Sequence, residues 1–179
     1  VGDQLVRFKE GNTSNTGFGV MKYLDPTANN FNWFCESTTD YLIFRYGEIL
    51  LNCAEAAFEL GKTAEALDAV NQIRDRAGIA KLGTIDREKI HHERKVELVF
   101  ENHRYWDLRR WRTAVKSLTR TYTGLRYVYD AASGKYRLDF IDDIDGRAKK
   151  PTFPEKNYYF PIGQGRIAAN PNLVENPGY

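Results

Sequence analysis

The sequence predicts a mostly α-helical fold, with a helical hairpin, further helices, long irregular loops and at most a small β-hairpin. Between residues 45 and 118, apolar side chains recur at the three- and four-residue spacing of amphipathic helices. The flanking stretches 1–40 and 119–179 are instead rich in glycine, asparagine and proline, which favour turns. With 179 residues, 42% of them hydrophobic and 28% charged, the chain has the size of one domain or part of one.

Two helices joined by a short linker are predicted between residues 45 and 77. The first covers Arg45–Leu60, and Gly61 is placed to end it. Thr63 is placed to cap the second, which covers residues 64–77 and stops at Gly78. A linker this short makes the helices antiparallel. The apolar stripe of the first helix consists of Ile49, Leu50, Cys53, Ala54, Ala57 and Phe58.

Small residues stand where the two helices of this hairpin come closest. Ala54 and Ala66 are twelve residues apart, with Gly61 at the turn between them. The arrangement resembles one tetratricopeptide (TPR) unit, in which small side chains let the helices approach. A single hairpin cannot bury its own apolar face, so we expect it to pack on other elements.

A third helical segment is predicted to begin near residue 84, with Thr84 or Asp86 as its cap. We expect a break at Asn102, because asparagine tolerates the left-handed conformation. A further helix then runs over residues 104–118. The apolar positions before the break are Ile90, Leu98, Val99 and Phe100.

Beyond residue 118 the helical period is lost. Residues 124–146 alternate large and polar side chains around turn signals, which predicts a small β-hairpin. Three of the six prolines lie in residues 161–179, so this tail is predicted to run extended, with a short helical turn near residues 163–168. The expected organisation is a loop-rich lead-in (1–40), a helical core (41–118), and irregular loops with an extended tail (119–179).

The charge balance does not favour nucleic acid. The formal net charge is +2, from 26 basic and 24 acidic residues, which is too small to argue for an acidic partner. Residues 104–112 mix basic and aromatic side chains as nucleic-acid binders do. On a helix, however, Tyr105, Leu108 and Trp111 or Arg112 share a face that is expected to be core. We interpret the run as a core anchor surrounded by ion pairs and predict no nucleic-acid partner.

The cysteines, the apolar runs and the first residues of the sequence limit the class of protein further. Cys35 and Cys53 permit one disulfide without requiring it. No apolar run approaches the roughly 18 residues needed to span a bilayer. The first residues, VGDQLVRFKE, lack the pattern of a signal peptide and begin without Met. We therefore expect the sequence to be an excised part of a longer protein.

Acidic residues on the third helical segment invite a catalytic interpretation, which their spacing disfavours. Glu93, Glu97 and Glu101 project from one helix face, whereas glycoside hydrolysis needs two carboxylates facing each other across a substrate cleft. We interpret these acids as ion-pair partners, since the planar fork of arginine suits such networks. The candidate partners are Arg74, Arg76, Arg104, Arg109 and Arg110.

Metal sites are equally weak in the sequence. His92 and His103 would lie roughly 16 Å apart along a continuous helix, too far to share an ion. The acidic stretch ending at Gly146 has Ile141 and Thr152 where an EF-hand needs acids, which excludes that motif. A looser calcium site and a solvated acidic turn both remain open there. We predict no catalytic residue, no metal ligand and no cofactor.

Four segments carry a recognisable pattern in order. They are YLIFRYGEILLNCAEAAFELG (41–61), ALDAVNQIRDRAGI (66–79), HERKVELVFENHRYWDLRRW (92–111) and YYFPIGQGRIAANPNLVENPGY (158–179). Together they resemble the C-terminal domain of the SusD/RagB family. The chain departs from that pattern at Gly47, Asn102, Gly163 and Glu175, where the family usually has Ala, Gly, Pro and Gln. Family members are several hundred residues long, so an N-terminal half with further helical pairs and a lipid-bearing cysteine is expected beyond this sequence.

The resemblance implies a function. Members of the family are surface-exposed lipoproteins of the bacterial outer membrane that bind oligo- or polysaccharide without catalysis. The implied partners are a glycan ligand and a SusC-like, TonB-dependent transporter, and the implied membrane contact is a lipid anchor in the N-terminal part. The alternative is a TPR-like protein–protein interaction scaffold without a glycan site; a glycoside hydrolase is a third, more distant one.

Aromatic side chains on polar loops are the candidate ligand contacts, because sugars present apolar faces ringed by hydroxyls. Aromatic residues make up 13% of the chain. The first candidate group is Phe31, Asn32, Trp33 and Phe34. The second is Tyr127, Tyr129 and Tyr136, near Arg126, Asp130 and Arg137. Trp33 and Phe34 have an alternative role as core anchors of their loop. The resemblance transfers no binding residue.

Overall fold

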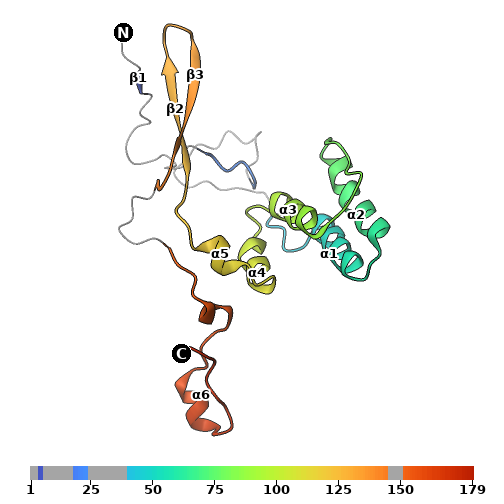
Figure 1. Ribbon diagram of the computed structural model, residues 1–179, viewed down its shortest axis with the longest axis vertical. Coiled ribbons are helices and arrows are strands. Elements are labelled where there is room, and N and C mark those ends of the chain that lie inside the picture. The colour runs from blue at the N-terminus through green and yellow to red at the C-terminus, as the bar shows by residue number, and fades with distance from the viewer. Residues whose placement is uncertain (1–3, 6–17, 24–39, 145–150) are drawn as a thin grey trace. The chain divides into compact units, whose positions relative to one another are not determined.

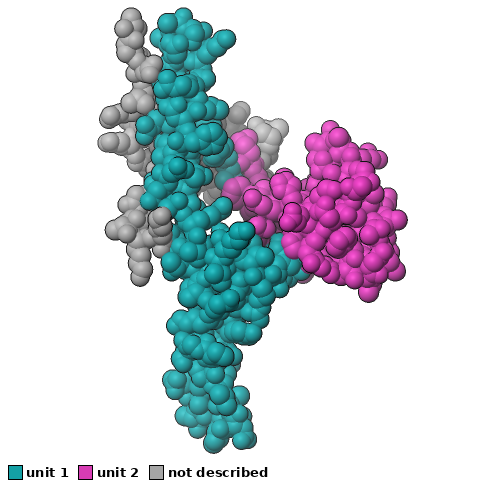
Figure 2. Space-filling view, in the orientation of Figure 1, with its two compact units in different colours: residues 1–20, 107–179 teal, residues 21–106 magenta. Residues whose placement is uncertain are grey.

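The computed structural model describes residues 4–5, 18–23, 40–144 and 151–179. The chain divides into two compact units, residues 21–106 and residues 1–20 with 107–179, which Figure 2 colours separately. Across the described residues there are six α-helices, one 3₁₀ helix and a three-stranded sheet. The prediction of a mostly helical fold is therefore confirmed.

The first two helices of unit 21–106 form the predicted hairpin (Figure 1). Helix α1 covers Tyr46–Glu59 and helix α2 covers Thr63–Arg76. Gly61 has a φ of +74°, and the amide of Lys62 donates to the Ala57 carbonyl at 2.8 Å. Glycine adopts this left-handed conformation without strain, which is how it ends α1. The fully buried side chains of the hairpin include Leu51, Ala54, Ala66 and Val70.

Helix α3 (Arg87–Glu97) covers the apolar face of the hairpin. Asp86 caps it, since its carboxylate accepts a hydrogen bond from the Lys89 amide at 2.8 Å. Ile90 is 1% exposed and packs with Ala54 and Val70. The expected packing of the hairpin on another element is confirmed, with the third helical segment as that element.

Two local predictions about the hairpin are wrong. Ile49 and Cys53 are exposed, whereas Glu48 and Leu51 are buried. The buried face of α1 is the one that packs on α2 and α3, and it is rotated from the stripe that hydropathy alone favours. Thr63 is the first residue of α2 rather than its cap, and its side chain makes no capping hydrogen bond.

The predicted helix over residues 104–118 is two helices. Helix α4 covers His103–Arg110 and helix α5 covers Ala114–Leu118. Between them Arg112 has a φ of +56°, and the Thr113 amide donates to the Leu108 carbonyl at 2.9 Å. This is the Schellman geometry that Gly61 adopts after α1. The sequence pattern missed the break because an arginine occupies the position where glycine would mark it.

The second unit contains a small antiparallel sheet in the order β1–β2–β3. The strands cover Gln4–Leu5, Gly124–Asp130 and Lys135–Ile141. Strands β2 and β3 form the predicted hairpin (Figure 1), with Gly134 at a φ of +65° in the turn. The two-residue strand β1 pairs along the other edge of β2 and was not predicted.

The hydrophobic core of this unit is formed by residues of α4, α5 and the C-terminal tail. Leu108, Ala114, Phe153 and Tyr158 form a buried cluster. The tail contains a 3₁₀ helix, η1 (Glu155–Tyr158), and the helix α6 (Gln164–Ala169). The predicted helical turn near residues 163–168 is therefore confirmed.

Candidate functional site

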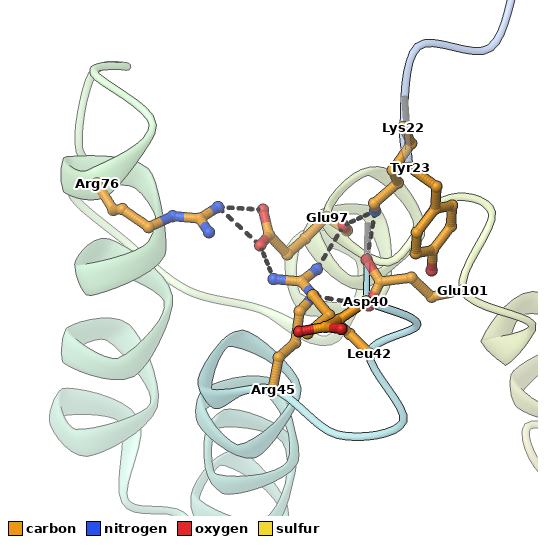
Figure 3. A pocket seen from close by; sticks show the side chains of 8 residues that line it. All are labelled: Lys22, Tyr23, Asp40, Leu42, Arg45, Arg76, Glu97 and Glu101. Carbon is orange, nitrogen blue, oxygen red and sulfur yellow. Dashed lines mark hydrogen bonds and ion pairs between the residues drawn. The ribbon is translucent and has the colours of Figure 1, made fainter. Parts of the chain in front are cut away.

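A polar hollow lies at the end of α3 within unit 21–106 (Figure 3). Its volume is about 410 Å³. Figure 3 shows Arg45 placed between two carboxylates, with Arg76 reaching in from α2. The lining side chains are Lys22, Tyr23, Asp40, Leu42, Arg45, Arg76, Glu97 and Glu101.

Glu97 is held by two arginines. Arg45 donates from Nη1 to Glu97 Oε1 at 2.5 Å and from Nη2 to the Glu97 carbonyl at 2.7 Å. Arg76 Nη2 lies 2.7 Å from Oε1 and 2.9 Å from Oε2 of the same carboxylate. A Cβ at Gly47 would stand 2.5 Å from Arg45 Nη1, so the glycine leaves room for the guanidinium.

Glu101 is the more deeply placed carboxylate, with a side chain 6% exposed. It accepts from Arg45 Nε at 2.6 Å and from the ammonium of Lys22. Burial raises the pKa of Glu101, but the hydrogen bonds from Arg45 and Lys22 outweigh it and hold that pKa below its ordinary value. In return, the hydrogen bond to Glu101 raises the pKa of Arg45.

This geometry favours the ion-pair interpretation of the acids over the catalytic one. A glycosidase acid needs a raised pKa and an opposing carboxylate across a cleft, whereas the pKa of Glu101 is lowered and Glu101 shares its cation with Glu97. Glu93 is likewise paired, with Arg74 Nη1 at 2.7 Å. The prediction that Arg74 and Arg76 pair with these acids is confirmed. The described contacts add Arg45 and Lys22, which sequence reasoning did not place in the network.

The turn between α3 and α4 carries two left-handed residues. Phe100 and Asn102 both have a φ of +63°. The break predicted at Asn102 is therefore confirmed, whereas Phe100 is a bulky residue in a conformation that such residues rarely adopt. Asn102 Nδ2 donates to Tyr41 Oη at 3.0 Å, and the Tyr41 ring stacks on Tyr23 with centroids 5.8 Å apart.

A second pocket of about 450 Å³ opens beside this turn, again within unit 21–106. Tyr105 is 42% exposed and Trp106 is 55% exposed, so the prediction that Tyr105 faces the core is wrong. The buried residues of α4 are instead Asp107, Leu108 and Arg109. The pocket is lined by Leu98, Phe100, Asn102, Arg104, Tyr105 and Trp106. The predicted core face assumed one continuous helix over residues 104–118, whereas α4 ends at Arg110 and its buried residues are consecutive in the chain.

Two of the predicted ligand residues lie together on the sheet. Tyr127 and Tyr129 are alternate residues of β2 and so share one face, and Tyr136 of β3 is paired opposite Tyr129. The rings of Tyr129 and Tyr136 have centroids 5.1 Å apart. Tyr127 and Tyr129 are half-buried and Tyr136 is 61% exposed. Phe31, Asn32, Trp33 and Phe34 lie outside the described residues.

The opposite face of the same sheet differs in character. It carries Val128, which is buried, and an ion pair between exposed Arg137 and half-buried Asp139, with Arg137 Nε 2.9 Å from Asp139 Oδ1. Arg126 is exposed on this face as well. The hairpin therefore has one ring-bearing face and one charged face.

The described part of the chain contains no group of three or more His, Cys, Asp or Glu side chains that could hold a metal ion. His103 Nε2 lies 3.6 Å from Glu48 Oε2, which is a two-residue contact. Asp139 of the candidate calcium stretch is paired with Arg137 instead. In the same described residues, no helix is long and apolar enough to cross a membrane.

Comparison with known proteins finds matches to one family along most of the chain. The model of the SusD family matches residues 7–179. SusD-like protein P38 of Formosa agariphila is 37% identical over 91 residues, 44% of this chain and 18% of that protein. SusD-like protein P2 of the same organism is 28% identical over 173 residues, 88% of this chain and 29% of that protein.

A solved structure shows the same architecture. The crystal structure of a SusD-like protein from Bacteroides fragilis matches with a TM-score of 0.64 at 33% identity, over 79% of this chain and 26% of that one. The chain spans between 18% and 29% of the length of the curated relatives it matches.

Proposed function

Because the chain belongs to the SusD family, we propose that it binds an oligo- or polysaccharide at the cell surface without transforming it. Proteins of this family bind carbohydrates and are generally non-catalytic. The proposed setting is a nutrient-uptake complex with a SusC-like, TonB-dependent transporter. The proposed location is the outer membrane, reached by a lipid anchor outside these residues.

The observation that carries the proposal is the ring-bearing face of the β2–β3 hairpin. Tyr127, Tyr129 and Tyr136 stand on one side of the sheet, with Tyr136 61% exposed. Each tyrosine offers an apolar ring and a hydroxyl that both donates and accepts. A sugar presents matching groups, because its ring C–H atoms form an apolar face and its hydroxyls surround that face. We assign Tyr127 and Tyr129 as saccharide contacts.

The loop residues remain in the proposal as a second contact group. Trp33, with Phe31, Phe34 and Asn32, combines flat rings with an amide that can bind sugar hydroxyls. Binding without turnover is supported by the ion pairs of Glu97 and Glu101, since both acids are engaged by cations that hold the helices together.

The test is saccharide binding by the full-length protein. We expect Tyr127→Ala combined with Tyr129→Ala to weaken binding of the best oligosaccharide probe by at least about tenfold, because the double change removes two of the three rings of that face. Calorimetric titration with maltohexaose, xylohexaose, laminarihexaose and mannohexaose measures the loss. Arg126→Ala is the matched control, since Arg126 is an exposed residue of the same strand on the opposite face.

Three results would contradict the proposal. An unchanged affinity in the double variant and in Trp33→Ala would remove the proposed contacts. Failure of the unmodified protein to bind any glycan, together with stable capture of a protein partner, would favour the interaction scaffold. Sustained turnover of a glycan by the pure protein would restore a hydrolase.

A further inference from the structure

We propose that the pocket beside the α3–α4 turn is a second saccharide-binding site, which takes one pyranose ring of a neutral glycan. The pocket lies wholly within residues 21–106 and shares no residue with the β2–β3 hairpin. Its volume of about 450 Å³ falls within the range of roughly 300–1,000 Å³ typical of small-molecule sites. The inference rests on the proposed saccharide-binding function and adds a site to it.

The rings of the pocket form a corner. Tyr105 and Trp106 meet edge to face, with centroids 5.4 Å apart and an angle of 77° between the ring planes. Their exposed surfaces therefore stand nearly at right angles. Phe100, 58% exposed, lines the pocket from the turn. A pyranose that places its C–H face on one ring meets a second apolar wall at its edge, which fits this corner better than a flat surface would.

The polar groups of the pocket match hydroxyls. Asn102 Nδ2 donates to Tyr41 Oη, which orients the amide and leaves its Oδ1 as an acceptor with no partner among the described residues. Arg104 also lines the pocket and has only donors. A hydroxyl both donates and accepts, so it can use either group. The six lining residues include no carboxylate, which would otherwise favour a cationic ligand.

The backbone of the turn argues for a ligand contact at Phe100. Its φ of +63° is strained for any residue with a Cβ, and Phe100 is more than half exposed among the described residues, so its contacts with them do little to offset that strain. Glycine would adopt the same conformation freely. The side chain at this position thus opposes folding locally while it lines the pocket, and contact with a ligand accounts for both facts.

The turn is also held from its other side. Glu101, between the two left-handed residues, is bound by Arg45 and Lys22, and Lys22 Nζ additionally donates to the Val99 carbonyl at 2.8 Å. These contacts fix the turn before any ligand arrives. A site built on a fixed turn loses less entropy on binding, which is the advantage of preorganisation. The ion-pair network therefore fixes the backbone of the turn that lines the pocket.

The decisive experiment compares folding and binding in one variant of the full-length protein. We expect Phe100→Gly to leave the midpoint of thermal unfolding unchanged or raised, because it relieves the strained φ. The same variant should bind the best hexasaccharide probe about tenfold more weakly, because it removes one wall of the corner. Trp106→Ala should weaken binding to a similar degree, and Trp106→Phe, which keeps a flat ring, should restore most of it.

Each outcome separates this site from the hairpin site. If binding survives Phe100→Gly and Trp106→Ala but falls in the Tyr127 and Tyr129 double variant, the pocket assignment is overturned and the proposed function stands. If Phe100→Gly lowers the unfolding midpoint and leaves binding intact, the ring is a packing residue and the assignment is overturned as well. If the unmodified protein binds none of the four hexasaccharides, both proposals fail.

Discussion

The arginines that join separate elements do so in different ways in the two units, whereas Arg110 and Arg137 pair with carboxylates of their own helix and strand. In unit 21–106, Arg45, Arg74 and Arg76 meet carboxylates that lie on or just after α3. In the unit formed by residues 1–20 and 107–179, Arg109 and Arg112 instead lie over aromatic rings of the tail. The guanidinium of arginine can thus join two elements by an ion pair where a carboxylate lies opposite, or by stacking where an aromatic ring does.

The stacked arginine contacts are as specific as the ion pairs. The Arg109 guanidinium carbon lies 4.2 Å from the Phe160 ring centroid, and its Nη2 donates to the Tyr158 carbonyl at 2.8 Å. Arg112 lies 4.7 Å from the ring centroid of Tyr158 and 4.9 Å from that of Tyr159. These contacts do not require a carboxylate, so they should respond little to acidification.

Arg45→Ala is expected to have the largest effect on stability. It removes the cation that Glu97 and Glu101 share, while Glu97 keeps Arg76 and Glu101 keeps Lys22. Breaking a buried pair costs about 3–5 kcal/mol when a charge is left unpaired, so we expect a loss at the lower end of that range. The loss should appear in urea unfolding and as faster amide hydrogen exchange in α1 and α3. The matched control is Arg87→Ala, because Arg87 pairs with Glu59 at the surface, where a pair contributes at most about 1 kcal/mol. Equal losses in the two variants would refute the ionic description of this unit.

Arg109→Met should have an intermediate effect. It keeps the apolar stem but removes the stacked guanidinium and the charged donor to the Tyr158 carbonyl, a loss of about 2 kcal/mol. Hydrogen exchange should increase around η1 and not in α1. Arg137→Met is the control, since Arg137 is exposed and its pair with Asp139 is also at the surface. If Arg109→Met proves as mild as Arg137→Met, stacking does not hold the tail.

The smallest effect is a change in pH dependence. The folded-state pKa of Glu101 lies below its unfolded value of about 4.3, so at mildly acidic pH the unfolded state binds more protons than the folded one. Its contribution to stability is present above that unfolded value and is lost as the pH falls through the folded pKa. The free energy of unfolding, measured in urea between pH 7 and pH 3, should therefore fall less steeply with decreasing pH in Glu101→Gln than in the unmodified protein. A parallel decline in both proteins would show that Glu101 is not part of the acid response.

Much of the local structure followed from single residues. Gly61 and Gly78 end α1 and α2 with φ values of +74° and +68°, and Asn102 adopts the predicted left-handed conformation. Where the same geometry falls on Phe100 and Arg112, the sequence carried no signal, because neither residue type marks a positive φ. The pocket beside the α3–α4 turn was missed for this reason.

The candidate contacts on the sheet were predictable in part. Alternation along a strand places Tyr127 and Tyr129 on one face whatever the rest of the fold does. The sequence alone does not fix which residue lies opposite Tyr129, because its pairing with Tyr136 depends on the register set by the turn at residues 131–134.

By itself, the sequence determined the helical hairpin, the β2–β3 hairpin and the presence of acids along one face of α3, because these depend on neighbours in the chain. It narrowed the cap of α3 to Thr84 or Asp86, and the structure chose Asp86. Only the tertiary structure decided which cation each acid meets. Arg45 reaches Glu101 across 56 residues, and no local pattern encodes that partner. Such pairs form because packing α3 on the hairpin takes charges out of water, and each buried charge must then find an opposite one within reach.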